Sequence, residues 1–458
     1  MKEDMKFVTP AELQKICIAT TKLEKLNFSF ENQKEYHDIL NNLNKVQFDN
    51  CYFQTQWHHN SKKDIEYLNC KFDEFQILNA SENKIMTIGC LFYNCEFKEI
   101  NCEGVVFEKI LFKFNNLYKH KKIEKVRFAN CEFRENFLLN IAPSEDNRFK
   151  ITNLDLSEST FKKKVKIQFL NIEKASFYNT KFKDLADFYQ TNFNEVVFER
   201  ADFENVAVFS EAEFNKNIDF KYVKFLGKSI FRDTVIIGEL NLRDTIFADE
   251  ANFLDITSEK RKKNYKDEYI GDAKEIKVSN RETARIIKNF YDASNNIIEA
   301  NKFYALEMEE REKELTKDIK NVKNISELPI FKAHKISSNH SQDWVLALLW
   351  ILNIGLIFSM FTSFYHDNML AYISILLLIV TVALKLNNTL FKILILVNFI
   401  IFDWLSYVHL DEIADKINPF SIMTSKDPIT FWLLLFKVTI AYLIYQFIVS
   451  VRQNTRRK

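Results

Sequence analysis

The sequence predicts two parts of different fold class: a mainly β amino-terminal half built as a solenoid, and an α-helical part that ends in a transmembrane bundle. Three observations predict this. Bulky apolar residues recur at steps of five or six positions through the first part. Long uncharged apolar runs occupy the last part. Phe is abundant at 44 residues, whereas Gly (6) and Pro (5) are scarce, which disfavours glycine-rich phosphate-binding loops.

The repeat signal is strong from about Ala175 to Phe253 and weaker, but recurrent, from Val46 to Phe161. Its bulky positions are Phe188, Phe193, Phe198, Phe203, Phe209, Phe214, Phe220, Phe225, Phe231, Ile236, Leu242, Phe247 and Phe253. A smaller residue stands two positions before most of them. Because side chains alternate between the two faces of an extended segment, the small and the bulky residue point the same way. If each unit forms one wall of a four-sided coil, both kinds are buried, and the charged residues between them face water.

This pattern resembles the pentapeptide-repeat family, whose consensus is a small residue, Asp or Asn, Leu or Phe, and two polar residues. The matching segments are Ala186-Asp187-Phe188, Ala201-Asp202-Phe203, Ala212-Glu213-Phe214 and Ala251-Asn252-Phe253. The resemblance implies a right-handed quadrilateral β-helix over residues 44–256, interrupted near 111–124, after a cap region of residues 1–43. The six-residue steps after Phe203 imply an extra residue at alternate corners.

Five of the seven cysteines are predicted to be packing residues. Cys51, Cys70, Cys90, Cys95 and Cys131 each stand two positions before a Phe, in the slot that Ala fills later in the chain. A buried free Cys acts as a compact apolar side chain. The alternative, a zinc site, lacks any C-x-x-C pair. Disulfides are not expected, because an odd number of cysteines and the lack of a secretory segment indicate a reducing compartment.

Residues 257–342 are predicted to contain a charged linker at 258–278 and juxtamembrane helices at 281–291 and 296–319. A cluster of basic residues at 260–263 could contact anionic lipid headgroups, although a solvated loop is the favoured interpretation. The segments 295–308 and 337–344 are similar to the connecting segments of membrane-bound bacterial pentapeptide-repeat proteins. That resemblance brings no established activity.

Residues 343–458 are predicted to form a four-helix transmembrane domain, with spans at 344–364, 370–384, 390–407 and 429–451. Each approaches the roughly 20 residues that cross a bilayer as a helix. The middle pair could instead be a re-entrant hairpin. The basic tail after the last span and the lysines near 385–392 place both termini in the cytoplasm. With the resemblance, this predicts a multi-pass protein of the bacterial inner membrane, in contact with the lipid bilayer.

Two charges fall inside predicted spans. Asp403 and Lys437 lie at similar depths, about 9 to 12 Å from the outer ends of their helices. Because a charge at such a depth costs on the order of 2 to 3 kcal/mol, we expect the two to form an intramembrane ion pair. The alternative is an ion or proton path lined also by Asn398 and Gln446.

A polar cluster precedes the first span. His334 and His340, with Asp343, could sense pH or bind a cation. The simpler interpretation is a helix cap supplied by Ser341 or Asn339.

The sequence contains no Ser/His/Asp spacing, metal-ligand cluster or nucleotide-binding motif, so we expect no catalytic residues, no metal ligands, no cofactor and no enzymatic activity. The leading hypothesis is a membrane-tethered scaffold whose cytoplasmic solenoid binds a protein partner of unknown identity. The alternative is a small ion channel or transporter with a regulatory solenoid. A nucleic-acid partner is not expected, because the net charge is only +1. Nothing in the sequence predicts an oligomeric state.

Overall fold

The computed structural model of the chain describes residues 5–19, 22–28, 33–41, 46–58, 65–78, 87–113, 122–140, 148–260, 262–263, 269–270, 274–317, 322–362, 368–384, 387–406, 410–418 and 430–455. The chain divides into two compact units, Met1–Ile286 and Ile287–Lys458. The first unit is the solenoid, and the second is helical.

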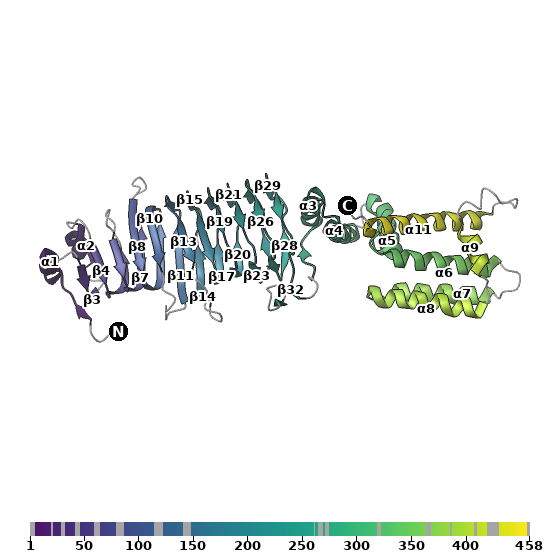
Figure 1. Cartoon of the computed structure of the whole chain (residues 1–458), viewed down its shortest axis with the longest axis horizontal. Coiled ribbons are helices and arrows are strands. Elements are labelled where there is room, and N and C mark those ends of the chain that lie inside the picture. Colours follow the sequence, from purple (N-terminus) through teal and green to yellow (C-terminus); the bar gives the residue numbers. More distant parts are fainter. Residues whose placement is uncertain are drawn as a thin grey trace. The chain divides into compact units, whose positions relative to one another are not determined.

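The first unit is a four-sided β-solenoid in which equivalent strands of successive coils pair in parallel (Figure 1). Face A consists of β1 (Lys6–Phe7), β3 (Leu26–Phe28), β5 (Tyr52–His58), β7 (Lys71–Leu78), β9 (Glu96–Glu103), β11 (Lys122–Ala129), β14 (Phe149–Asp155), β17 (Leu170–Ser176), β20 (Asn192–Val197), β23 (Glu213–Phe214) and β27 (Val235–Ile236). Face B consists of β2 (Lys22–Glu24), β4 (Val46–Asp49), β6 (Ile65–Leu68), β8 (Thr87–Tyr93), β10 (Val106–Lys113), β12 (Glu132–Phe133), β15 (Thr160–Phe161), β18 (Lys181–Phe182), β21 (Asp202–Phe203), β25 (Lys224–Phe225) and β29 (Ile246–Phe247).

Two further faces complete the coils. Face C consists of β13 (Phe137–Asn140), β16 (Val165–Gln168), β19 (Ala186–Asp187), β22 (Ala207–Val208), β26 (Ser229–Ile230) and β30 (Ala251–Asn252). Face D consists of β24 (Ile218–Asp219), β28 (Glu239–Asn241) and β33 (Lys277–Val278). The predicted fold class of the amino-terminal half is confirmed.

The coil length explains the mixture of five- and six-residue steps. Phe182, Phe203 and Phe225 hold the same position of face B in successive coils, so that a coil takes 21 residues and then 22. The corners inside five-residue steps contain a residue in the left-handed conformation, with φ between 54° and 61° at Arg200, Glu211, Tyr222, Asp233 and Asp244. The six-residue steps lie between these corners. The predicted extra residue at alternate corners is therefore confirmed.

The inward-facing Phe side chains stack on one another from coil to coil. In one stack, the ring centroids of Phe188, Phe209, Phe231 and Phe253 are separated by 5.1, 5.0 and 4.9 Å. Each ring also meets the rings of neighbouring walls edge-on, an arrangement that aromatic quadrupoles favour. The predicted core residues are buried, except that Phe247 is only partly buried on the edge strand of face B.

A helical cap covers the amino-terminal end of the solenoid. Helix α1 (Pro10–Ala19) begins with a capping box, in which Glu12 N donates to Thr9 Oγ1 (3.3 Å) and Thr9 N donates to Glu12 Oε2 (3.0 Å). Helix α2 (Gln33–Asn41) places the Tyr36 ring edge-on against Phe28, with centroids 5.3 Å apart. Because β1 and β2 already pair within faces A and B, the solenoid begins earlier than the predicted boundary at residue 44.

The carboxyl-terminal end of the solenoid also extends beyond its predicted boundary at residue 256. Strand β33 pairs with β28, and Thr283 in α3 (Arg281–Ala293) accepts a hydrogen bond from Leu242 N (2.9 Å). Between β30 and β33, β31 (Lys262–Lys263) pairs antiparallel with β32 (Tyr269–Ile270). The segment predicted as a flexible charged linker therefore contributes ordered strands, because Ile276 and Val278 supply buried side chains.

The interruption predicted near residues 111–124 is shorter than expected. Strand β10 pairs with β8 up to Lys113, with one register shift after Phe107, and β11 is in register with β14 from Lys122 onward. Residues 114–121 lie outside the described part of the chain.

The second unit contains α4 (Ile297–Lys317), α5 (Val322–Ser338), α6 (Trp344–Thr362), α7 (Asn368–Ala383), α8 (Asn388–Ser406), α9 (Leu410–Ile417) and α11 (Phe431–Thr455). The predicted helices at 281–291 and 296–319 are confirmed as α3 and α4. Helices α5 and α9 form where the sequence predicts none. Helix α6 is the central element, in contact with α7, α8, α9 and α11, and α6, α8 and α11 run alongside one another (Figure 1).

Three of these helices, α6, α8 and α11, are long and apolar enough to cross a membrane. Helix α7 has 16 residues, which span about 24 Å at 1.5 Å per residue, compared with a hydrocarbon core of about 30 Å. Large apolar side chains on the outer surfaces of these helices are exposed, among them Leu376, Ile400 and Trp432. Such a surface is typical of helices that face lipid.

Candidate functional site

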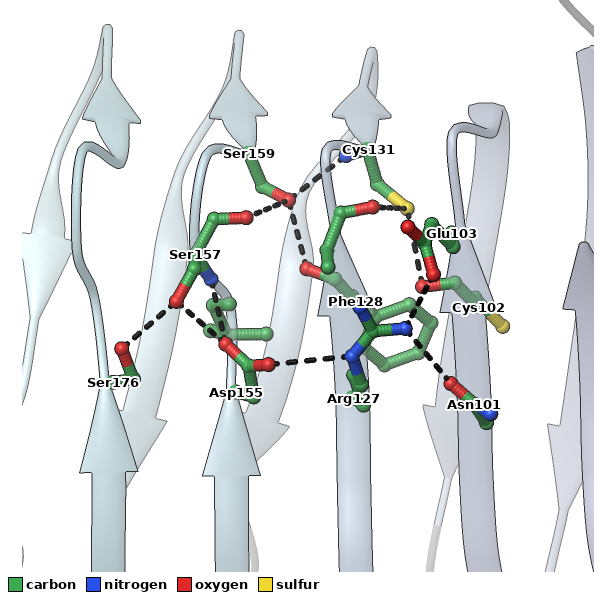
Figure 2. Close-up of polar contacts among 12 residues, drawn as sticks. Asn101, Cys102, Glu103, Arg127, Phe128, Cys131, Asp155, Ser157, Ser159 and Ser176 are labelled. Carbon is green, nitrogen blue, oxygen red and sulfur yellow. Dashed lines mark hydrogen bonds and ion pairs between the residues drawn. The ribbon is translucent and has the colours of Figure 1, made fainter. Parts of the chain in front are cut away.

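Neighbouring strands of face A carry a connected set of polar side chains, which we name the Arg127 cluster (Asn101, Glu103, Arg127, Asp155, Ser157 and Ser176; Figure 2). Arg127 Nη1 donates to Glu103 Oε2 (2.7 Å) and to Asn101 Oδ1 (3.2 Å). Its Nε lies 3.4 Å from Asp155 Oδ2. Asp155 Oδ1 in turn accepts hydrogen bonds from the Ser157 amide and hydroxyl, and Ser157 Oγ lies 2.8 Å from Ser176 Oγ.

The register of the parallel strands creates this cluster. Asn101, Arg127 and Asp155 hold equivalent positions in β9, β11 and β14, and adjacent strands lie only about 4.8 Å apart. The hydrogen bond to Glu103 raises the pKa of Arg127, and the guanidinium is held on both sides by acids. An arginine guanidinium stays charged, so it can orient a partner through its charge and N–H groups, but it cannot abstract a proton. The cluster is therefore suited to binding.

Behind this surface, small polar side chains tie successive coils together at one corner. Ser159 Oγ accepts from Cys131 N (2.9 Å) and donates to Phe128 O (2.8 Å), as Figure 2 shows. Thr180 and Thr245 donate in the same way to Leu156 O and Phe220 O. These residues occupy the small-residue slot, so a side chain that satisfies a backbone carbonyl can replace Ala there without loss of packing.

The cysteines use the same slot. Cys51, Cys70 and Cys95 are buried and donate weakly through Sγ to the carbonyls of Leu23, Phe48 and Tyr67, at 3.3 to 3.5 Å. Burial raises the pKa of Cys131 to about 12, which leaves its thiol protonated and unreactive. The prediction that five cysteines pack in the core is confirmed for Cys51, Cys70, Cys90, Cys95 and Cys131, and the structure adds the hydrogen bonds described above. Among the described residues, no three His, Cys, Asp or Glu side chains are placed to hold a metal ion.

Charged side chains on the outer surface pair between coils. Lys71 lies 3.2 Å from Glu96, Lys162 lies 2.6 Å from Glu132, and Lys224 lies 3.4 Å from Asp202. An exposed pair of this kind contributes at most about 1 kcal/mol to stability. Positive and negative side chains therefore alternate on the outer faces of the solenoid.

A family model described as pentapeptide repeats (9 copies) matches residues 177–223. The solenoid is a pentapeptide-repeat domain. The matched segment includes both five- and six-residue steps, and strand pairing continues from it in both directions along faces A and B of the pentapeptide-repeat domain. No curated protein and no solved structure matches the chain.

The two predicted intramembrane charges, Asp403 and Lys437, lie in the helical unit and do not form an ion pair with each other. Lys437 Nζ donates to the backbone carbonyls of Lys416 (2.8 Å) and Asn418 (2.7 Å), at the carboxyl end of α9. Asp403 Oδ1 is buried and has no hydrogen-bond partner among the residues that the structure describes. The predicted ion pair between Asp403 and Lys437 is therefore wrong. The ammonium group instead neutralises the negative end of the α9 dipole, because α9 brings its terminal carbonyls to Lys437.

Helix α9 is seated closely on α6. A Cβ atom added to Gly355 would come within 2.8 Å of Ile417 Cγ1 and 3.3 Å of Ile413 Cγ2. Ile413 is buried in one cluster with Leu356 and Met360 of α6. The absence of a side chain at Gly355 thus permits the close approach, and Lys437 caps the helix that the approach positions.

A polar layer crosses the middle of the helical unit between two apolar layers. Asn353 Nδ2 donates to Ile395 O (3.2 Å), and Ser374 Oγ donates to Asn398 Oδ1 (3.0 Å). The apolar layer on one side is Leu346, Leu349, Leu378 and Ile395, and the layer on the other side is Leu356, Met360, Ala371, Phe402 and Ile413. These hydrogen bonds join helices α6, α7 and α8 to one another, as interhelical polar contacts do in membranes. Gln446, the other predicted path residue, lies elsewhere and contacts the turn before α6.

The cap of the first membrane helix is Asp343, rather than the predicted Ser341 or Asn339. Asp343 Oδ1 accepts from Leu346 N (3.0 Å), and Oδ2 accepts from Lys392 Nζ and Asn388 Nδ2, both at 2.9 Å. Burial acts to raise the pKa of Asp343, but the bonds from Lys392, Leu346 and Asn388 together lower it. One carboxylate thus joins the amino-terminal ends of α6 and α8.

Proposed function

We propose that the chain is a non-enzymatic scaffold of the bacterial inner membrane, whose pentapeptide-repeat domain presents its outer faces in the cytoplasm to a protein partner. In this proposal the helical unit crosses the bilayer four times and leaves both termini in the cytoplasm. The observation that carries the proposal is the Arg127 cluster, a charged surface of face A whose side chains are already fixed by one another.

Fixed side chains favour recognition because little conformational freedom is lost on binding. Asp155 is held by Arg127 on one side and by Ser157 on the other. Solenoids bind along extended faces of this kind without needing a pocket. The mixed charge of the faces favours a protein over a nucleic acid, because a polyanion selects a surface of one sign.

The exposed apolar helices support the membrane anchor. Basic residues support its orientation. Lys385 precedes α8, and Lys392 lies in the second turn of α8. Arg452 lies in the last turn of α11, and three more basic residues follow α11 in the sequence. This arrangement predicts that both termini face the same compartment.

Photo-crosslinking in intact cells tests the proposal. A crosslinking amino acid at Asn153, exposed on face A beside the Arg127 cluster, should capture a protein that a matched crosslinker at Lys181, exposed on face B, does not capture. Arg127→Ala should reduce the yield at position 153. Equal capture at both positions, or capture unaffected by Arg127→Ala, would argue against recognition through this face. Recovery of the chain in the supernatant after detergent-free lysis would refute the membrane anchor.

The second candidate function is transport of a small ion, with the pentapeptide-repeat domain as regulator. The observation in its favour is the buried, unpartnered Asp403 Oδ1, since ionisable groups within membranes often mark ion pathways. The two apolar layers around Asn353 oppose it. Ion flux in liposomes that carry the full chain, abolished by Asp403→Asn, would favour transport over the scaffold.

A further inference from the structure

The turn that joins α5 to α6 has an unfavourable backbone. Asn339, His340 and Ser341 are consecutive residues in the left-handed conformation, with φ values of 47°, 56° and 64°. Residues other than Gly visit this region as single residues, because Cβ is crowded by the following carbonyl oxygen. Strain of this kind persists only where surrounding contacts impose it, and it clusters at switch regions.

The side chain at the centre of the turn is also poorly satisfied. His340 is 1% exposed, and neither Nδ1 nor Nε2 has a hydrogen-bond partner in the described part of the chain. A neutral imidazole carries one donor and one acceptor, so both are buried without compensation, which is unfavourable relative to their exposure to water. Opening of the turn would relieve both the backbone strain and this deficit.

Three serines hold the turn closed against α11. Ser338 Oγ and Ser341 Oγ both donate to Gln446 Oε1 at 3.0 Å. Ser341 N donates to Ser338 Oγ (3.0 Å), and Ser337 Oγ lies 3.4 Å from Tyr442 Oη. The closed turn is therefore a balance between these bonds and the strain of the buried histidine.

We propose that this turn is a pH-operated latch, closed while His340 is neutral and opened when His340 takes up a proton. Opening releases the junction of α5 and α6 from Gln446 of α11. The proposal is independent of the proposed function, because it concerns contacts within the helical unit alone.

The surroundings of His340 disfavour an imidazolium in the closed state. The His334 ring lies 5.7 Å away, measured between centroids, and Lys335 follows it on α5. On α4, Glu312 is paired with Lys335 (2.9 Å), and Asp343 is paired with Lys392 of α8. Tyr442 of α11 faces the turn through Ser337. The carboxylates of Glu312 and Asp343 are thus already paired with lysines.

The direction of the pH effect follows from the histidine pKa. Burial, with smaller contributions from the charges of His334 and Lys335, lowers the pKa of His340 from 6.5 to about 4. Opening exposes the ring and restores the ordinary value, so the open state binds the proton more tightly. The closed turn therefore keeps its full stability above pH 6.5 and loses it progressively as the pH falls toward 4. At pH 5 the ratio of open to closed turns should be about 30-fold higher than above pH 7.

Hydrogen–deuterium exchange of the full chain in lipid nanodiscs tests the latch. After correction for intrinsic exchange rates, amides 339–343 should open about 30-fold more at pH 5 than at pH 7.5. His340→Leu, which retains a buried side chain without a titratable group, should remove this dependence, and His334→Gln should retain most of it. His340→Gln serves in the same way if the Leu variant does not fold. Peptides from the pentapeptide-repeat domain should not respond, which separates local opening from acid unfolding.

Several results would overturn the proposal. One is a flat profile in the natural chain, and another is an unchanged acid response after His340 is replaced. A third is slower hydrogen exchange of the turn with added Zn²⁺ at pH 7.5 without any acid response, which would indicate that the histidines bind a metal ion.

Discussion

Phe209→Ala tests whether the inward stacks hold the solenoid together. Phe209 is fully buried, with its ring centroid 5.1 Å from Phe188 and 5.0 Å from Phe231. It also meets Phe198 and Phe220 edge-on, at 5.6 and 5.8 Å. Truncation of a buried Phe costs about 3–5 kcal/mol, because the transfer free energy is lost and a cavity remains. The lost aromatic pairs account for about 0.5–1.5 kcal/mol each within that total.

The loss should also be local. In a solenoid each coil contacts only its neighbours. The substitution should therefore decrease the free energy of opening mainly in β19, β22 and β26, the strands that precede Phe188, Phe209 and Phe231. Hydrogen exchange of the full chain measures this strand by strand. Exchange in β5 and β7, several coils away, should change far less.

Val197→Ala is the matched control. Val197 lies on face A and is exposed, so its truncation should change the opening free energy by less than about 0.5 kcal/mol. Equal effects of the two substitutions would refute the conclusion that the stacked Phe rings stabilise the coils.

Three further predictions concern close contacts and charges. Gly227→Ala should destabilise the solenoid by about 1–3 kcal/mol in urea unfolding, because the new Cβ would lie 2.6 Å from the backbone carbon of Asn205; unchanged stability would show that the corner can widen. Lys437→Met should lower the melting temperature of the protein in detergent, because the carbonyls of Lys416 and Asn418 lose their donor. In the same assay the decreases in melting temperature from Asp403→Leu and Lys437→Leu should add in the double variant. A smaller decrease in the double variant than in Asp403→Leu alone would support an ion pair between the two residues. Asp343→Asn should lower the same melting temperature at pH 7, and the difference from the natural chain should shrink as the pH falls below the ordinary pKa of about 3.8, since the lowered pKa of Asp343 stabilises the fold only while the carboxylate is charged.

The solenoid core could be predicted from the sequence because its determinants are local. The alternation of side chains along an extended segment assigns Ala201 and Phe203 to one side, whatever the rest of the chain does. The change from 21 to 22 residues per coil could be predicted for the same reason, since each six-residue step adds its extra residue at its own corner. The spacing of five cysteines, each two positions before a Phe, predicts the small-residue slot in which they lie buried.

The polar contacts of the helical unit could not be predicted in this way. The similar depths of Asp403 and Lys437 predict an ion pair only if no other element comes between their helices. Helix α9, in a stretch where no helix was predicted, supplies the carbonyls that Lys437 binds. The repeat pattern also does not reach the ends of the solenoid, because β1 and β33 depart from it and join the solenoid only by pairing with neighbouring strands.

The sequence by itself determined that Phe side chains line a four-sided coil and that long apolar helices follow, because both properties depend on short-range periodicity and on the local density of apolar residues. Only the tertiary structure decided which polar groups meet: Arg127 with Glu103 and Asp155 across separate coils, Lys437 with the end of α9, and His340 in a closed turn without a partner. The physical reason is that hydrogen bonds and ion pairs act over a few ångströms between residues far apart in the chain, and those distances exist only after the coils and helices have packed.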